Sequence, residues 1–107
     1  MKIHVYLNGL CIDLSIIKRT KKIIEAQNAH YTYKGAYKIN NDENIIIHGN
    51  GKLYHDKVLL RDGLWENGNF KNGKIYNSNH KIIYQGMMKN DKKHGSGILW
   101  IYIKNST

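Results

Sequence analysis

The chain has 107 residues, 41% of them hydrophobic, and this length predicts a single domain over residues 1–107. Seventeen Lys and Arg residues against eight Asp and Glu residues give a formal charge of +9, which favours anionic partners. The single cysteine, Cys11, excludes an intrachain disulfide and a zinc site built from several thiolates. No apolar run approaches the roughly 20 residues that a membrane-spanning helix needs.

The composition also bears on location and origin. The first apolar run, residues 3–12, is interrupted by His4, Asn8 and Gly9, which is not typical of a secretory signal. We therefore expect a soluble, cytoplasmic protein. Abundant Ile, Asn, Lys and Tyr are typical of an AT-rich genome, so codon usage explains part of the positive charge.

The N-terminal region contains two predicted elements. Asn8-Gly9 lies between alternating residues 2–7 and 10–14 and predicts a β-hairpin, because both turn positions accept positive φ. Ser15 is a candidate N-cap for a helix over residues 16–29, with isoleucines recurring at helical spacing. Residues 22–25 are also compatible with a strand. We expect the hairpin and helix of residues 1–30 to cap the remaining chain.

Residues 31–103 contain three related units, which indicate stacked hairpins. Each unit opens with an aromatic or basic residue before a glycine and closes with a second glycine, at a period of about 23 residues. A side chain at these glycines would hold neighbouring backbones apart. The opening glycines are Gly35, Gly63 and Gly86, and the closing glycines are Gly51, Gly73 and Gly97.

Apolar side chains flank these glycines at a spacing of two residues. Because strand side chains alternate between the two faces, this spacing predicts one apolar, aromatic layer and a polar exterior. The predicted layer includes Tyr33, Tyr37, Trp65, Tyr84 and Met88, together with Leu53, Ile75 and Leu99.

The units resemble MORN repeats, whose pattern is Tyr-x-Gly-x-Trp, a polar turn and Gly-x-Gly. Residues 84–86 with 94–97, and residues 33–35 with 48–51, match this pattern, while the middle unit has Arg61 for Tyr and Lys71 for a glycine. The resemblance implies a twisted ribbon of antiparallel hairpins. It also implies a protein-binding or dimerising module, and some members have been proposed to bind anionic phospholipid.

No residue set predicts catalysis, and we expect no enzyme activity, cofactor or metal. Cys11 in an apolar strand is interpreted as a small buried residue. His48 and His94 occupy the repeat position of Phe70, which favours packing over metal binding because no close ligand spacing accompanies them. No Ser lies in a triad-like context.

The sequence therefore predicts a mainly β, non-enzymatic binding protein with one N-terminal helix. We expect it to dock on, and inhibit or modulate, a larger protein or ribonucleoprotein with an acidic surface, as a phage or mobile-element anti-defence or anti-CRISPR inhibitor does. Anionic lipid and nucleic acid are the alternative partners. The tail 101–103 is a candidate for the second end cap of the stack, or for an edge that pairs with a second copy. The predicted partner-binding residues are Lys18, Arg19, Lys21, Lys22, Lys71, Lys74, Lys89, Lys92 and Lys93.

Overall fold

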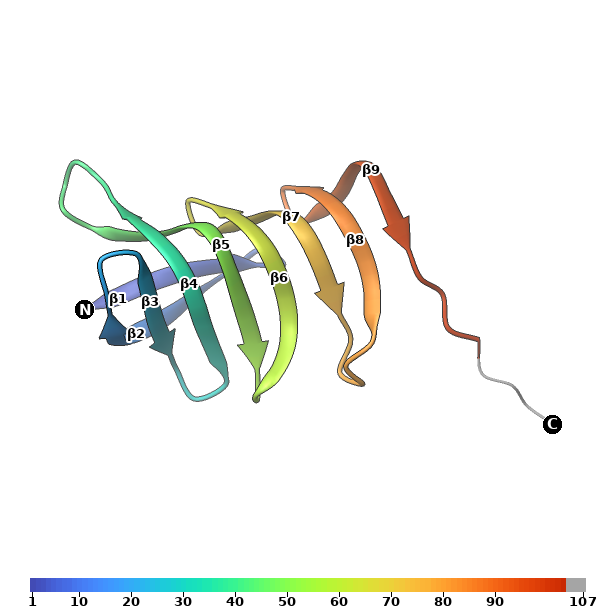
Figure 1. Cartoon of the computed structure of the whole chain (residues 1–107), viewed down its shortest axis with the longest axis horizontal. Coiled ribbons are helices and arrows are strands. Elements are labelled where there is room, and N and C mark those ends of the chain that lie inside the picture. Colours follow the sequence, from blue (N-terminus) through green and yellow to red (C-terminus); the bar gives the residue numbers. More distant parts are fainter. Residues whose placement is uncertain (104–107) are drawn as a thin grey trace.

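The computed structural model describes residues 1–103, which form one antiparallel sheet whose strands follow chain order (Figure 1). The mainly β prediction and the stacked hairpins are confirmed. Within these residues there is no helix, and hence none that could cross a membrane. The strands are β1 (Lys2–Leu7), β2 (Leu10–Arg19), β3 (Ile23–Gln27), β4 (Tyr31–Ile39), β5 (Ile45–His55), β6 (Val58–Glu66), β7 (Asn69–Tyr76), β8 (Ile82–Lys89) and β9 (Lys92–Leu99).

Four of the connections are two-residue turns in which both residues have positive φ. This geometry matches the right-handed twist of the flanking strands and suits Asn, Asp and Gly. The hairpin predicted from Asn8-Gly9 is confirmed, with φ values of 50° and 79°. The other three turns are Asp56-Lys57, Asn67-Gly68 and Asn90-Asp91.

The helix predicted over residues 16–29 is wrong. Residues 16–19 continue β2, and residues 23–27 form β3, which pairs with both β2 and β4. Thr20 closes the intervening turn, because its hydroxyl accepts the Ile23 N–H at 3.1 Å and its own N–H donates to the Ile23 carbonyl at 2.8 Å. The β-branched isoleucines suit a strand, and a helix would leave β4 without this partner.

The β1–β2 hairpin lies across one face of the sheet, which we call the inner face (Figure 1). Ile3, Val5 and Leu7 of β1 are buried there against β5 and β7. The N–H of Tyr6 donates to the Gly68 carbonyl at 3.0 Å, which ties β1 to the β6–β7 turn. The hairpin therefore covers the core, whereas the sequence analysis expected it to cap one end of the stack.

The six repeat glycines lie side by side across β4–β9. An added Cβ at Gly35, Gly63 or Gly86 would lie under 3 Å from the backbone of the paired strand. The expectation that side chains here would separate the strands is thus supported. The cross-strand row consists of Gly35, Gly51, Gly63, Gly73, Gly86 and Gly97.

Trp65 is the centre of the core and is fully buried. Its ring packs edge-on against Tyr33 and Phe70, with centroid distances of 5.7 and 5.1 Å, and its Nε1 donates to the Gly51 carbonyl at 3.1 Å. Burial raises the pKa of Tyr33, whose hydroxyl donates to the Ala36 carbonyl. The predicted aromatic layer therefore forms, although Tyr37 is only half-buried and Leu99 is exposed.

Two expectations about single residues are wrong. Cys11 is exposed, because it lies on the solvent face of β2 while its neighbours Leu10 and Ile12 point the other way. His94 is exposed opposite Met87, whereas Phe70 is buried opposite Trp65. The bulges that follow the glycines differ between these hairpins, so the two positions do not share a packing role.

Candidate functional site

Strand β9 is the free edge of the sheet. Within residues 1–103 it pairs with β8 alone, and all eight of its residues are exposed. The opposite end of the sheet differs, since β1 folds back and pairs with Asn69 of β7. An unpaired edge presents a row of backbone donors and acceptors that another strand can bind. We call β9 and the residues beside it the β9 edge.

The side chains of the β9 edge divide into a basic half and an apolar half. Lys92, Lys93 and His94 begin the strand, and all are exposed. Ile98 and Leu99 end it, with exposed fractions of 56% and 54%. Apolar residues continue beyond the strand, where Ile101 and Ile103 are also exposed. A single extended segment therefore carries both positive charge and apolar surface.

Leu99 is exposed because the covering hairpin does not reach it. It stands in the same cross-strand row as the buried Tyr33, Leu53, Ile75 and Tyr84. The tip of the β1–β2 hairpin ends at Asn8, and an open hollow of about 330 Å³ separates it from the inner face of β8 and β9. The hollow has an apolar floor and a charged rim, and its lining consists of Asn8, Arg61, Ile75, Ile83, Tyr84, Met88, Asp91, Lys92 and Lys93.

Arg61 brings a positive charge into this apolar layer. Its side chain is only 6% exposed and lies 3.9 Å from the Asp91 carboxylate, with the guanidinium over the Phe70 ring. Burial lowers the pKa of Arg61, while the Asp91 charge raises it. Among the described residues, Nε and Nη1 have no hydrogen-bond partner. The hollow therefore has positive charge both on its wall and at its rim.

The predicted partner-binding residues fall into separate places. Lys18, Arg19, Lys21 and Lys22 are exposed at the β2–β3 end, whereas Lys89, Lys92 and Lys93 gather in the β8–β9 hairpin at the other end (Figure 1). Lys71 and Lys74 lie on β7 between them, with Lys74 opposite Asp62. The structure thus places two groups of the predicted residues at opposite ends of the sheet, and only the β8–β9 group adjoins the β9 edge.

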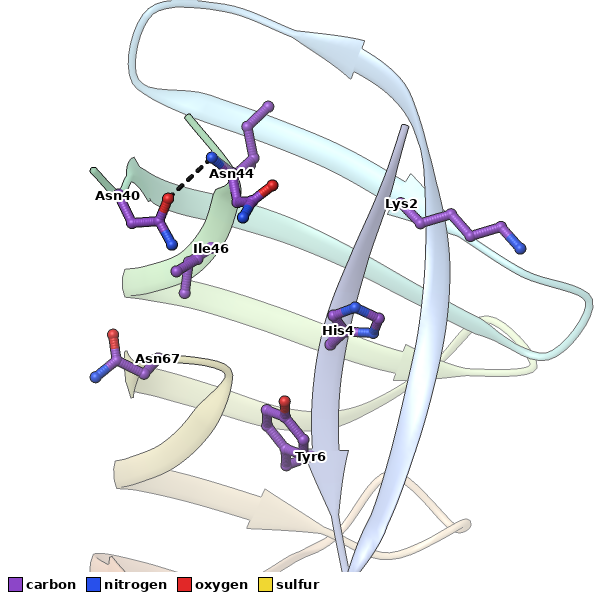
Figure 2. Close-up of a pocket in the computed structure, with 8 residues that line it drawn as sticks. Lys2, His4, Tyr6, Asn40, Asn44, Ile46 and Asn67 are labelled. Atoms are coloured by element: carbon purple, nitrogen blue, oxygen red, sulfur yellow. Dashed lines mark hydrogen bonds between the residues drawn. The ribbon is translucent and has the colours of Figure 1, made fainter. Parts of the chain in front are cut away.

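A second hollow, of about 410 Å³, lies elsewhere, between β1 and the β4–β5 loop (Figure 2). Asparagine amides dominate its wall, and the Asn44 N–H donates to the Asn40 side chain at 2.9 Å. Its ionisable lining residues are Lys2, His4 and Tyr6, and the Asp13 carboxylate lies 2.6 Å from the His4 Nδ1. This hollow shares no lining residue with the hollow beside β8 and β9, so it is separate from the β9 edge.

Sequence reasoning missed Arg61 as part of the site. It was noted only as a departure from the repeat pattern, at the place where the other units have Tyr33 and Tyr84. That equivalence was itself the available signal, because a residue aligned with two buried tyrosines must point into the same layer.

No family model matches the sequence, and comparisons with curated proteins and with solved structures find no significant match.

Proposed function

We propose that this protein is a non-enzymatic binding module that receives an extended segment of a larger protein along its β9 edge. The observation that carries the proposal is the free, fully exposed β9 strand beside a hollow with an apolar floor. Strand addition uses backbone hydrogen bonds for affinity and alternate side chains for specificity.

The chemistry of β9 defines the partner segment. Acidic side chains would face Lys92 and Lys93, and apolar side chains would extend the layer over Leu99. If two copies paired through antiparallel β9 strands that overlap over their whole length, Lys92 would lie beside Leu99 and Lys93 beside Ile98. Each copy also carries a formal charge of +9. Charge and side-chain pairing therefore favour an acidic foreign segment over a second copy.

We further propose that the repeats are MORN-like, because the paired glycines and the aromatic layer recur in each unit. The hydroxyl of Tyr84 donates to the Met87 carbonyl at 2.8 Å, as Tyr33 donates to Ala36. Inhibition of the bound partner, and a phage or mobile-element origin, stay predictions drawn from small size and composition.

Selection from a displayed library of random peptides tests the proposal. We expect the selected peptides to be extended and to combine acidic residues at one end with apolar residues at the other. Leu99→Lys should weaken their binding about tenfold or more, because the partner would cover Leu99 and burying such a side chain contributes about 1.5–3 kcal/mol. Fluorescence polarisation with the wild-type chain and the variant measures this change.

Ile23→Lys is the matched control. Ile23 is 55% exposed and Leu99 is 54% exposed, but Ile23 lies on β3, which has a strand on both sides. This variant should bind the peptides as the wild type does. Equal weakening by both substitutions, or selected peptides without acidic residues, would contradict strand addition at the β9 edge.

Anionic lipid and nucleic acid are the alternative partners, and separate binding assays test each of them. On the solvent face, a cross-strand row of lysines is interrupted by Glu25 and Asp62, which weakens its field toward a polyanion. Salt-sensitive flotation with acidic liposomes, or a mobility shift of nucleic acid that falls steeply with salt, would favour those partners instead.

A further inference from the structure

The geometry points to a transition-metal site on the solvent face of the β1–β2 hairpin, with His4, Cys11 and Asp13 as ligands of Zn²⁺ or a similar borderline cation. This inference is independent of strand addition at β9. Among the described residues, these three exposed side chains form a group whose ligand atoms all lie within 4.8 Å of one another.

The hairpin register brings the three ligands to one face. His4 pairs directly with Asp13, and Tyr6, two residues beyond His4, pairs with Cys11. Cross-strand partners and residues two apart share a face of a sheet, so all three side chains point away from the core. The two-residue turn at Asn8-Gly9 sets this register, and Asn28 holds the Asp13 carbonyl at 3.2 Å. The ligands therefore stand on a defined backbone.

The separations suit a tetrahedral metal. The Cys11 Sγ lies 3.6 Å from the His4 Nδ1. Zinc bonds of about 2.3 Å to sulfur and about 2.05 Å to nitrogen, at a tetrahedral angle, place these atoms about 3.5 Å apart. The Asp13 Oδ1 is 2.6 Å from the same nitrogen, in a hydrogen bond. The carboxylate must withdraw by about 0.7 Å to admit the metal, which an exposed side chain can do.

The donor set selects the class of metal. A thiolate, an imidazole and a carboxylate suit Zn²⁺ and Co²⁺, whereas Mg²⁺ and Ca²⁺ prefer oxygen ligands. Metal binding releases the Cys11 thiol proton to solvent. The ring proton of His4 moves through solvent from Nδ1 to Nε2, so that the ring stays neutral and Nδ1 is free to bind the metal. The thiolate and carboxylate neutralise the two positive charges of the cation. His4 also lines the hollow beside β1, which leaves room for water as a fourth ligand (Figure 2).

Titration of the tag-free chain with Co²⁺ tests the site. We expect one Co²⁺ per chain, with a near-ultraviolet thiolate charge-transfer band, and displacement of that ion by Zn²⁺. Cys11→Ser should abolish the band. His4→Gln and Asp13→Asn should each weaken Co²⁺ binding by about tenfold or more, since loss of an outer-shell partner alone costs about 10–100-fold.

The chain offers a matched control in a second exposed imidazole–carboxylate pair. His30 Nδ1 lies 3.1 Å from Asp56, and no thiol is near it because Cys11 is the only cysteine. His30→Gln should leave Co²⁺ binding unchanged. Alkylation of Cys11 by iodoacetamide gives a second readout, which Zn²⁺ should slow in the wild type and not in His4→Gln. Absence of the charge-transfer band, or equal effects of His4→Gln and His30→Gln, would overturn the assignment.

Discussion

Gly63 and Gly95 represent two different reasons for glycine in this sheet. Gly63 has no positive φ, but an added Cβ would lie 2.7 Å from the Gly73 Cα and close to the Asn72 carbonyl. Gly95 has a φ of 65°, and the nearest atom to an added Cβ is the Met87 sulfur at 3.7 Å. Close approach of strands requires the first glycine, and backbone conformation requires the second.

These two roles predict different mutational profiles. Gly63→Ala should reduce the free energy of unfolding by about 3 kcal/mol, the upper end of overpacking costs, because two backbones must separate. Gly95→Ala should cost about 1 kcal/mol from left-handed backbone strain. Gly95→Asn should be close to neutral, because Asn tolerates that conformation, whereas Gly63→Asn should not be. Urea unfolding curves measure all four, and a tolerated Gly63→Asn would contradict the close approach.

At the scale of elements, Asp91 connects the covering hairpin to the last repeat. Its carboxylate accepts the Gly9 N–H at 3.1 Å and lies 3.9 Å from the Arg61 guanidinium. The β1–β2 turn, strand β6 and the β8–β9 turn therefore meet at one charged group. This contact holds the tip of the hairpin over the inner face and sets one wall of the hollow.

Charge removal at Asp91 tests this connection. Asp91→Asn keeps a side chain that accepts the Gly9 N–H and tolerates the positive φ, so it removes mainly the countercharge of Arg61. We expect destabilisation below the roughly 3–5 kcal/mol typical of closely paired buried ions, because 3.9 Å is a long separation.

Arg61→Met provides the comparison, since it removes the buried charge. Asp91→Asn should destabilise the Arg61→Met variant much less than the wild type, and a double-mutant cycle from denaturation curves measures the coupling. Equal losses in both backgrounds would show that the Asp91 charge does not stabilise the fold through Arg61.

For the whole molecule, the excess of positive charge opposes the compact state. Lys89 and Lys92 are directly opposed next to the β8–β9 turn, and within residues 1–103 neither forms an ion pair. Like charges directly opposed in a sheet are destabilising. The fold is therefore expected to gain stability when salt screens these lysines.

Lys89→Gln tests this expectation. The variant should be more stable than the wild type by about 0.2–1 kcal/mol at low salt, because it removes a like-charge pair. The difference should disappear near 0.5 M NaCl, where screening lengths fall to roughly 4–5 Å. Thermal unfolding at several salt concentrations measures both effects. A gain that persists at high salt would have a cause other than charge.

Local chemistry was sufficient to predict the N-terminal hairpin and the hairpins of the repeats. Asn8-Gly9 and the recurring glycines favour particular backbone shapes whatever surrounds them, and alternation then assigns Trp65 and Tyr84 to the buried layer. The meeting of His4 with Asp13 also follows from the two-residue turn, although sequence reasoning did not apply that register. Such features depend on contacts between residues that are close in the chain.

Residues 16–27, the covering hairpin and the Arg61 hollow depended instead on distant partners. The isoleucines of residues 16–27 fit a helical or an extended spacing, and β4 selects the strand by pairing with residues 23–27. The placement of β1 against β5 and β7, and hence the exposure of Leu99, results from burial of Ile3 and Val5 by residues far along the chain. Periodicity within a segment carries no information about which distant surface will cover it.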